Sequence, residues 1–231
     1  MEISNIDEYY NDQSKLNCIN LNPLSFQNIF RACLVGPSSA GKTNLVMNLL
    51  TKSYIYYDNL YILLKDKNEP KYAVFLTDFI EKINEQRVDN PITLLITDNI
   101  KDLPDYEAID NTKQNIIIFD DIVNEPKLQK DIFEMFLRYR KVNCSIIYQS
   151  QSFQKIPVAV RANTNYFVIF QISKTELRTV YNSLQLPLTI HEFVEFYNDV
   201  FSIKHNFMII DLVNPVLILR SGFDKILKID K

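Results

Sequence analysis

Apolar and polar positions along the chain follow two patterns that alternate. Short continuous apolar runs bounded by polar residues are typical of strands that are buried on both faces of a parallel sheet. The sequence places such runs at residues 30–35, 60–64, 92–97, 115–121, 145–148 and 166–171. These runs predict the strands of a mostly parallel sheet.

Helical patterns, with apolar residues spaced three or four apart, lie between most of these runs. They cover residues 44–50, 72–88, 175–184 and 190–201. Asn124-Glu-Pro126 is a helix-start signal, and one apolar face follows it. That face comprises Leu128, Ile132, Met135 and Tyr139. Strands that alternate with helices indicate the α/β class, with helices flanking a mostly parallel sheet.

The end of the chain departs from this alternation. Two apolar runs, 207–212 and 215–219, are separated by two residues and predict a C-terminal β-hairpin. We expect residues 26–231 to form a single domain and residues 1–25, which are polar and acidic, to form an N-terminal arm.

Composition narrows the classes of protein that remain. The 231 residues are 47% hydrophobic and 23% charged, so the chain can bury a core. A net charge of −3 excludes a protein that coats nucleic acid with a globally basic surface, although a local basic patch remains possible. No apolar run has the length of a membrane span, and the N-terminus does not resemble a signal peptide. Three cysteines without ligand spacing suit a reducing compartment.

Glycine is scarce, since the chain has only three. Two of them occur in Gly36-Pro37-Ser38-Ser39-Ala40-Gly41-Lys42-Thr43, which matches the phosphate-binding loop pattern and is followed by Asn44. In such a loop, backbone N–H groups point at the β-phosphate and the helix N-terminus adds positive potential. The motif predicts an ATP site in which Lys42 reaches the β- and γ-phosphates and the Thr43 hydroxyl is a Mg²⁺ ligand.

The run at residues 115–121 ends in two acids, Asp120 and Asp121. A buried parallel strand delivers such carboxylates to the edge of the sheet where nucleotides bind. We expect Asp120 to hold the Mg²⁺ hydration shell, and Asp121 to orient and partly deprotonate the attacking water.

Polar residues and arginines gather after this strand. Residues 148–152 read Tyr-Gln-Ser-Gln-Ser, and a glutamine there can hydrogen-bond the γ-phosphate or the water. Arg138, Arg140, Arg161 and Arg178 occupy one stretch of a chain that otherwise prefers lysine. We expect Arg140 or Arg178 to reach the phosphates of a neighbouring subunit, and Arg161 to be structural or to face DNA.

Taken in order, these segments resemble the viral genome-packaging ATPases of the FtsK/HerA superfamily, found in poxviruses, giant DNA viruses, virophages and Polinton-like elements. The resemblance covers residues 30–227 and is most specific at residues 140–170, where a strand ends in Ser-Gln and is followed by Ile-Pro and Arg-x-Asn-x-Asn.

The resemblance implies a RecA-like P-loop fold in which the 145–148 strand lies between the strand of the phosphate loop and the Asp120 strand. It places Gln151 at the sensor glutamine of the family, with Gln149 as the neighbouring candidate. Arg140 matches a family arginine that is often followed by histidine, where this chain has Lys141. Asp121 stands where several relatives have glutamate.

The resemblance also implies a function: an ATP-driven, Mg²⁺-dependent motor that moves double-stranded DNA into a preformed capsid. The expected partners are DNA, capsid or portal proteins, and further copies of the chain in a hexameric or pentameric ring. The expected location is the virion or the viral factory in the host cytoplasm. Two alternatives stay open, a small P-loop kinase acting on a nucleoside or nucleotide and a nucleotide-gated scaffold protein. The sequence has no acceptor-site motif and no arginine-rich lid, which disfavours a kinase. The intact set of loop and acidic residues disfavours a scaffold that does not hydrolyse ATP.

Overall fold

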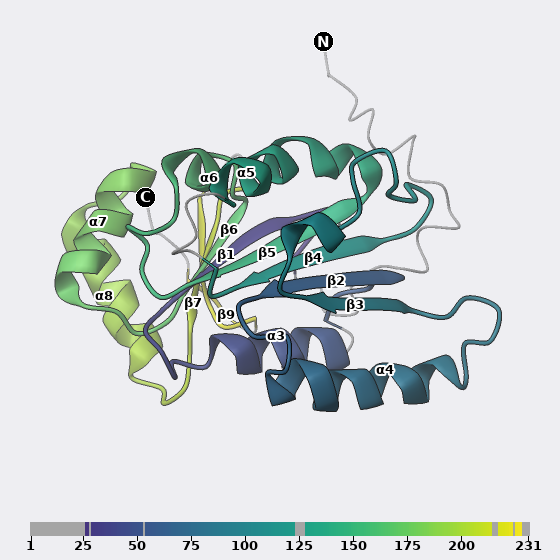
Figure 1. The fold of residues 1–231 in the computed structure, drawn as a ribbon. Coiled ribbons are helices and arrows are strands. Elements are labelled where there is room, and N and C mark those ends of the chain that lie inside the picture. The colour runs from purple at the N-terminus through teal and green to yellow at the C-terminus, as the bar shows by residue number, and fades with distance from the viewer. Residues whose placement is uncertain are drawn as a thin grey trace, which may run out of the picture.

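A computed structural model describes residues 26–27, 29–52, 54–122, 128–213, 217–223 and 225–227. Within these ranges the chain forms a nine-stranded sheet with helices on both faces (Figure 1). The predicted arm at residues 1–25, the helix-start signal at 124–126 and Asn214 of the predicted hairpin turn lie outside the described residues.

Parallel strands make up most of the sheet. In sheet order they are β3 (Thr93–Thr97), β2 (Asn59–Leu64), β4 (Asn115–Asp120), β5 (Cys144–Ser150), β1 (Arg31–Val35) and β6 (Tyr166–Ile169). β5 pairs with β1 on one side and with β4 on the other, which confirms the strand order that the resemblance implied.

Antiparallel strands complete the sheet beyond β6. They are β7 (Met208–Asp211), β8 (Ile218–Ser221) and β9 (Lys225–Leu227). β7 and β8 confirm the expected pair of C-terminal antiparallel strands. β9 was not predicted, because it has three residues and the described side chains of Lys225 and Ile226 are exposed, so it leaves no buried apolar run in the sequence.

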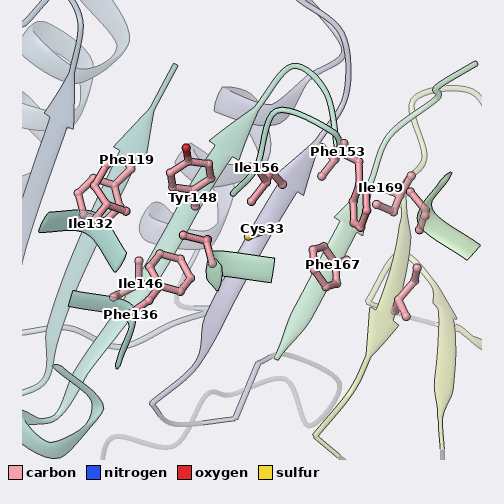
Figure 2. Close-up of a cluster of buried hydrophobic side chains, with 14 of the residues drawn as sticks. Cys33, Phe119, Ile132, Phe136, Ile146, Tyr148, Phe153, Ile156, Phe167 and Ile169 are labelled. Atoms are coloured by element: carbon pink, nitrogen blue, oxygen red, sulfur yellow. The ribbon is translucent and has the colours of Figure 1, made fainter. Parts of the chain in front are cut away.

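Each strand of the sheet centre is apolar on both faces because helices cover both. α3 (Lys42–Thr51), the π-helix η1 (Lys71–Leu76) and α4 (Thr77–Asn84) pack on one face. α5 (Gln129–Arg138), α6 (Val158–Ala162), α7 (Lys174–Leu184) and α8 (Ile190–Phe201) pack on the other. Figure 2 shows the core under α5 and α6, where Phe136 of α5 meets Ile146 and Tyr148 of β5.

The strand at residues 115–121 shows how burial follows from the pattern. Ile116 and Ile118 of β4 point into the core beneath α3 and α4, whereas Ile117 and Phe119 point into the core beneath α5. Side chains alternate across a strand, so a strand with a core on each side needs apolar residues at every position.

The prediction of one helix over residues 72–88 is wrong in two respects. Its first part is the π-helix η1, and α4 ends at Asn84. The Asn84 side chain bonds both the N–H and the carbonyl of Ile92, at 2.7 and 2.9 Å, and so ties the chain to the segment that enters β3. Val88 is 79% exposed and does not extend the apolar face.

Other helices agree closely with the pattern. α8 has the predicted bounds, and α5 buries Ile132 and Met135 on one face as expected. In the part of the chain that the structure describes, we find no helix with the length and hydropathy needed to cross a membrane.

Candidate nucleotide and metal site

The phosphate-loop motif connects the end of β1 to the start of α3. The Gly36 N–H donates to the Ser150 carbonyl of β5 at 3.2 Å, and the Ala40 N–H donates to the Pro37 carbonyl at 3.2 Å. Gly41 directly precedes α3 with a φ of 106°, a left-handed value that favours glycine. The loop therefore curls back from the sheet edge and ends on a helix N-terminus, as an anion-binding loop requires.

Gly36 is fixed by close packing. A Cβ atom at this position would lie 2.6 Å from the Cβ of Phe170, which follows β6. Real Cβ atoms do not approach so closely, so a larger residue would displace the loop. The motif thus depends on β6 as well as on its own sequence.

Lys42 folds into the curve of the loop. Its Nζ donates to the carbonyl oxygens of Gly36 and Pro37, at 2.6 and 2.9 Å. Burial lowers the pKa of Lys42, while the nearby carboxylates of Asp120 and Asp121 act in the opposite direction. The ammonium group, the loop and both acids therefore share one site.

Asp120 ends β4 at the same edge of the sheet. Its Oδ2 accepts a hydrogen bond from the Tyr72 hydroxyl at 2.7 Å. Burial is the main cause that raises the pKa of Asp120, and the Tyr72 hydrogen bond acts against it. Carboxylate and hydroxyl oxygens are the hard ligands that Mg²⁺ prefers, so Asp120 and the Thr43 hydroxyl suit this ion.

Asp121 leaves the line of the strand. Its backbone is left-handed, with a φ of 53°, and its side chain is exposed. Both carboxylate oxygens accept from Gln151 Nε2, at 2.8 and 3.0 Å. The two consecutive acids therefore occupy different environments, because Asp120 is half-buried at the end of β4 and Asp121 is open to solvent.

The two sensor candidates also differ. Gln151 follows β5 and contacts Asp121, whereas Gln149 lies within β5, is fully buried and donates to the Tyr72 hydroxyl at 3.0 Å. Tyr72 was not among the predicted site residues. A tyrosine in an apolar helical pattern is read as core, and no local motif marks its contact with Asp120.

The arginines do not join this cluster. Arg140 lies in a short 3₁₀ turn, Tyr139–Val142, that precedes β5. It therefore lies near the N-terminal end of β5, whereas the loop lies near the C-terminal end of that strand. At roughly 3.3 Å per strand residue, the two ends are about 20 Å apart. Burial of Arg31, at the start of β1, is the main cause that lowers the pKa of Arg31, and the charge of Arg140 lowers it further. Arg140 is too far away to reach the loop of its own chain.

The remaining arginines have varied surroundings. Arg178 is exposed on α7. Arg161 stacks on Phe153, with its guanidinium carbon 4.8 Å from the ring centre, and Arg138 stacks in the same way on Tyr106 at 4.5 Å. These ring contacts agree with a structural role for Arg161.

A cleft of about 840 Å³ adjoins the outer side of the loop. It is bounded by residues 37–40, by Gln151, by the first turn of α7 and by the segment between α8 and β7. This volume is in the range of ligand pockets.

The family assignment follows from a comparison with known proteins. Residues 20–216 match the family described as the Poxvirus A32 protein. The chain belongs to the poxvirus A32 family. Among curated relatives, the DNA packaging protein OPG160 of Monkeypox virus is 23% identical over 176 residues. This match covers 73% of the present chain and 58% of the monkeypox protein.

Other relatives give a similar result. The OPG160 protein of Variola virus is 22% identical over 180 residues, which is 77% of this chain and 66% of that protein. For the vaccinia protein (strain Western Reserve) the match covers 64% of the relative. The present chain thus spans about three-fifths of the length of the monkeypox and vaccinia proteins.

Solved structures identify the fold. The genome packaging NTPase B204 from Sulfolobus turreted icosahedral virus 2, in complex with ATP-γS, superposes with a TM-score of 0.56 at 16% identity. The alignment covers 84% of the present chain and 98% of B204. The complex of B204 with AMPPCP gives a TM-score of 0.57 at 15% identity, over 85% of this chain and 100% of that one. The A32-family chain therefore has the RecA-like P-loop fold expected from its sequence.

The different environments of the two acids lead to a prediction. We expect Asp121→Asn to bind an ATP analogue normally but to lose about 10²- to 10⁴-fold in turnover, the range for a general base. Asp120→Asn, which changes the half-buried carboxylate, should instead weaken metal-dependent nucleotide binding. Equilibrium binding and phosphate release measured on both variants check this. Normal hydrolysis by the Asp121 variant would mean that another group is the base.

Proposed function

We propose that this chain is an ATP-driven, Mg²⁺-dependent motor that moves double-stranded DNA into a viral capsid. The observation that carries the proposal is the convergence of Lys42, Asp120, Asp121 and Gln151 at one sheet edge, in a chain of the poxvirus A32 family. Relatives of this family are named as DNA packaging proteins.

Each residue has a defined part in this proposal. The backbone of residues 36–44 holds the ATP phosphates, and Lys42 offsets charge on the β- and γ-phosphates. The Thr43 hydroxyl and the Asp120 carboxylate hold Mg²⁺, whose charge neutralises the phosphate oxygens when it is bound. Asp121 accepts a proton from the attacking water. Gln151, whose Nε2 donates to both Asp121 carboxylate oxygens, fixes the orientation of that carboxylate.

Hydrolysis is completed by a neighbouring copy in a hexameric or pentameric ring. Arg140 is placed on the opposite sheet edge, so it can serve only the site of another subunit. Arg178 is the second candidate. A ring also agrees with a net charge of −3, because a motor grips DNA through a limited inner surface. The proposed partners are DNA and a capsid or portal protein, and the proposed location is the virion or the cytoplasmic viral factory.

One assay separates the motor from the two alternatives. ADP formation and free phosphate are both measured from ATP, with and without linear duplex DNA, and with a panel of nucleosides as acceptors. A motor hydrolyses ATP faster with DNA, a kinase needs an acceptor, and a scaffold releases almost no phosphate. ATP-dependent displacement of a third strand from the duplex, absent with ATP-γS, reports movement along DNA. ADP formation that is indifferent to DNA, rises with a nucleoside and is not matched by free phosphate would overturn the proposal in favour of a kinase.

A further inference from the structure

A chain of hydrogen bonds runs from the sheet centre to Asp120. Gln149 Nε2 donates to the Tyr72 hydroxyl at 3.0 Å, and this hydroxyl donates to Asp120 Oδ2 at 2.7 Å. Tyr72 and Gln149 have no solvent exposure. A tyrosine hydroxyl has one proton, so accepting from Gln149 directs that proton toward the carboxylate. The order of the two bonds is therefore fixed by the chemistry of the groups.

The backbone that carries Tyr72 is unusual. η1 is a π-helix. This conformation is rare in proteins, and where it occurs it is often at a functional site. The Tyr72 N–H donates to the Glu69 carbonyl at 3.0 Å, and its carbonyl accepts from the Thr77 hydroxyl at 3.2 Å. Tyr72 is thus held on both sides of its peptide unit, which fixes where its ring enters the core.

Gln149 is a costly residue for its position. It lies in β5, where each residue is buried, and its Oε1 has no hydrogen-bond partner among the residues that the structure describes. Burying an unpaired amide oxygen is unfavourable, so an apolar side chain of the same shape would suit the core better. The amide is explained if its N–H is needed to orient the Tyr72 hydroxyl.

We propose that Tyr72 is a positioning residue for the metal site. It ties down Oδ2 of Asp120 through a hydroxyl that Gln149 orients, and leaves Oδ1 available to the Mg²⁺ shell. This inference rests on the proposed function, because it assumes that Asp120 serves a bound metal–nucleotide complex. Groups that orient a metal ligand in this way typically change metal affinity or activity 10- to 100-fold when they are mutated.

The test compares two tyrosine variants in the full chain. Tyr72→Phe removes the hydrogen bond to Asp120. Tyr57→Phe is the matched control, since Tyr57 lies in the same core, is 5% exposed and donates its hydroxyl to the Leu50 carbonyl at 3.1 Å. Mn²⁺ binding in the presence of ATP-γS is followed by electron paramagnetic resonance, and the melting temperature is measured in parallel. We expect a 10- to 100-fold weaker Mn²⁺ affinity for Tyr72→Phe alone, with similar losses of melting temperature in both variants.

A third variant keeps the test decisive if Tyr72→Phe does not fold. Gln149→Met removes the amide but leaves Tyr72 and Asp120 in contact. If the chain of bonds serves the metal, this variant should bind Mn²⁺ more weakly while its melting temperature is unchanged or raised. Wild-type Mn²⁺ affinity in the folded variants would overturn the inference. If the wild-type protein binds Mn²⁺ with ATP-γS but shows no DNA-stimulated hydrolysis, and Tyr72→Phe still binds Mn²⁺ more weakly, the result counts against the motor and leaves the role of Tyr72 standing.

Discussion

Replacing Lys42 with alanine is expected to reduce ATP hydrolysis to the uncatalysed background while the fold is retained. The Lys42 ammonium lies inside the loop, bonded to the Gly36 and Pro37 carbonyls, where we propose that it supplies the charge that offsets the γ-phosphate. Enzymes typically accelerate their reactions 10⁶-fold or more, so loss of this charge carries the largest effect that we expect. Phosphate release and ATP-γS binding measure it.

Lys52→Ala is the matched control for this variant. Lys42 is the first residue of α3 and Lys52 directly follows the last one, and the side chain of Lys52 is exposed. It should hydrolyse ATP at the wild-type rate, which separates the loss of a lysine in general from the loss of the loop lysine. Wild-type turnover by the Lys42 variant would contradict the ATPase assignment.

Replacing Arg140 with alanine is expected to lower turnover by about 10³- to 10⁵-fold, the range for an arginine supplied by a neighbouring subunit. A guanidinium can brace two oxygens of the transferring phosphoryl group, which a lysine cannot do. Because Arg140 precedes β5, it stands at the edge opposite to its own loop. Mixing the Arg140 variant with the Lys42 variant should therefore restore part of the activity, since a mixed ring can place an intact loop against an intact arginine.

Lys141→Ala controls for the loss of one positive charge at the same surface, because Lys141 is the exposed neighbour of Arg140. It should keep near-normal turnover. If Arg178→Ala is inactive and Arg140→Ala is active, the arginine comes from α7. If both arginine variants hydrolyse ATP normally, or if mixing never restores activity, hydrolysis does not use an arginine in trans.

Several parts of the site could be predicted because their signals are local. The phosphate loop needs a fixed series of residues within one turn, and the run that ends at Asp120 and Asp121 needs only apolar residues at successive positions. Parallel strands present their carboxyl ends at one edge, so the pattern also predicted that the loop and the acids would meet. The charges of the two acids raise the pKa of Lys42 against the effect of its burial, which agrees with that expectation.

Other parts have no local signal. Tyr72 is separated from Asp120 by 48 residues, and its sequence surroundings are those of a core tyrosine in a helix. The π-helix that positions Tyr72 was predicted as part of an ordinary helix. The spacing of apolar residues does not show which hydrogen-bond pattern a helix has. Gln149 and Gln151 lie two residues apart, and only the end of β5 at Ser150 decides that one is buried and the other reaches Asp121.

The sequence by itself thus determined the class of fold, the phosphate loop and the pair of acids, since these depend on the order of residues along short segments. The tertiary structure alone decided which polar groups share the site. It placed Tyr72 against Asp120, Gln151 against Asp121 and Phe170 against Gly36. These contacts join segments far apart in the chain, and their geometry is set by the register and packing of strands that no single segment encodes.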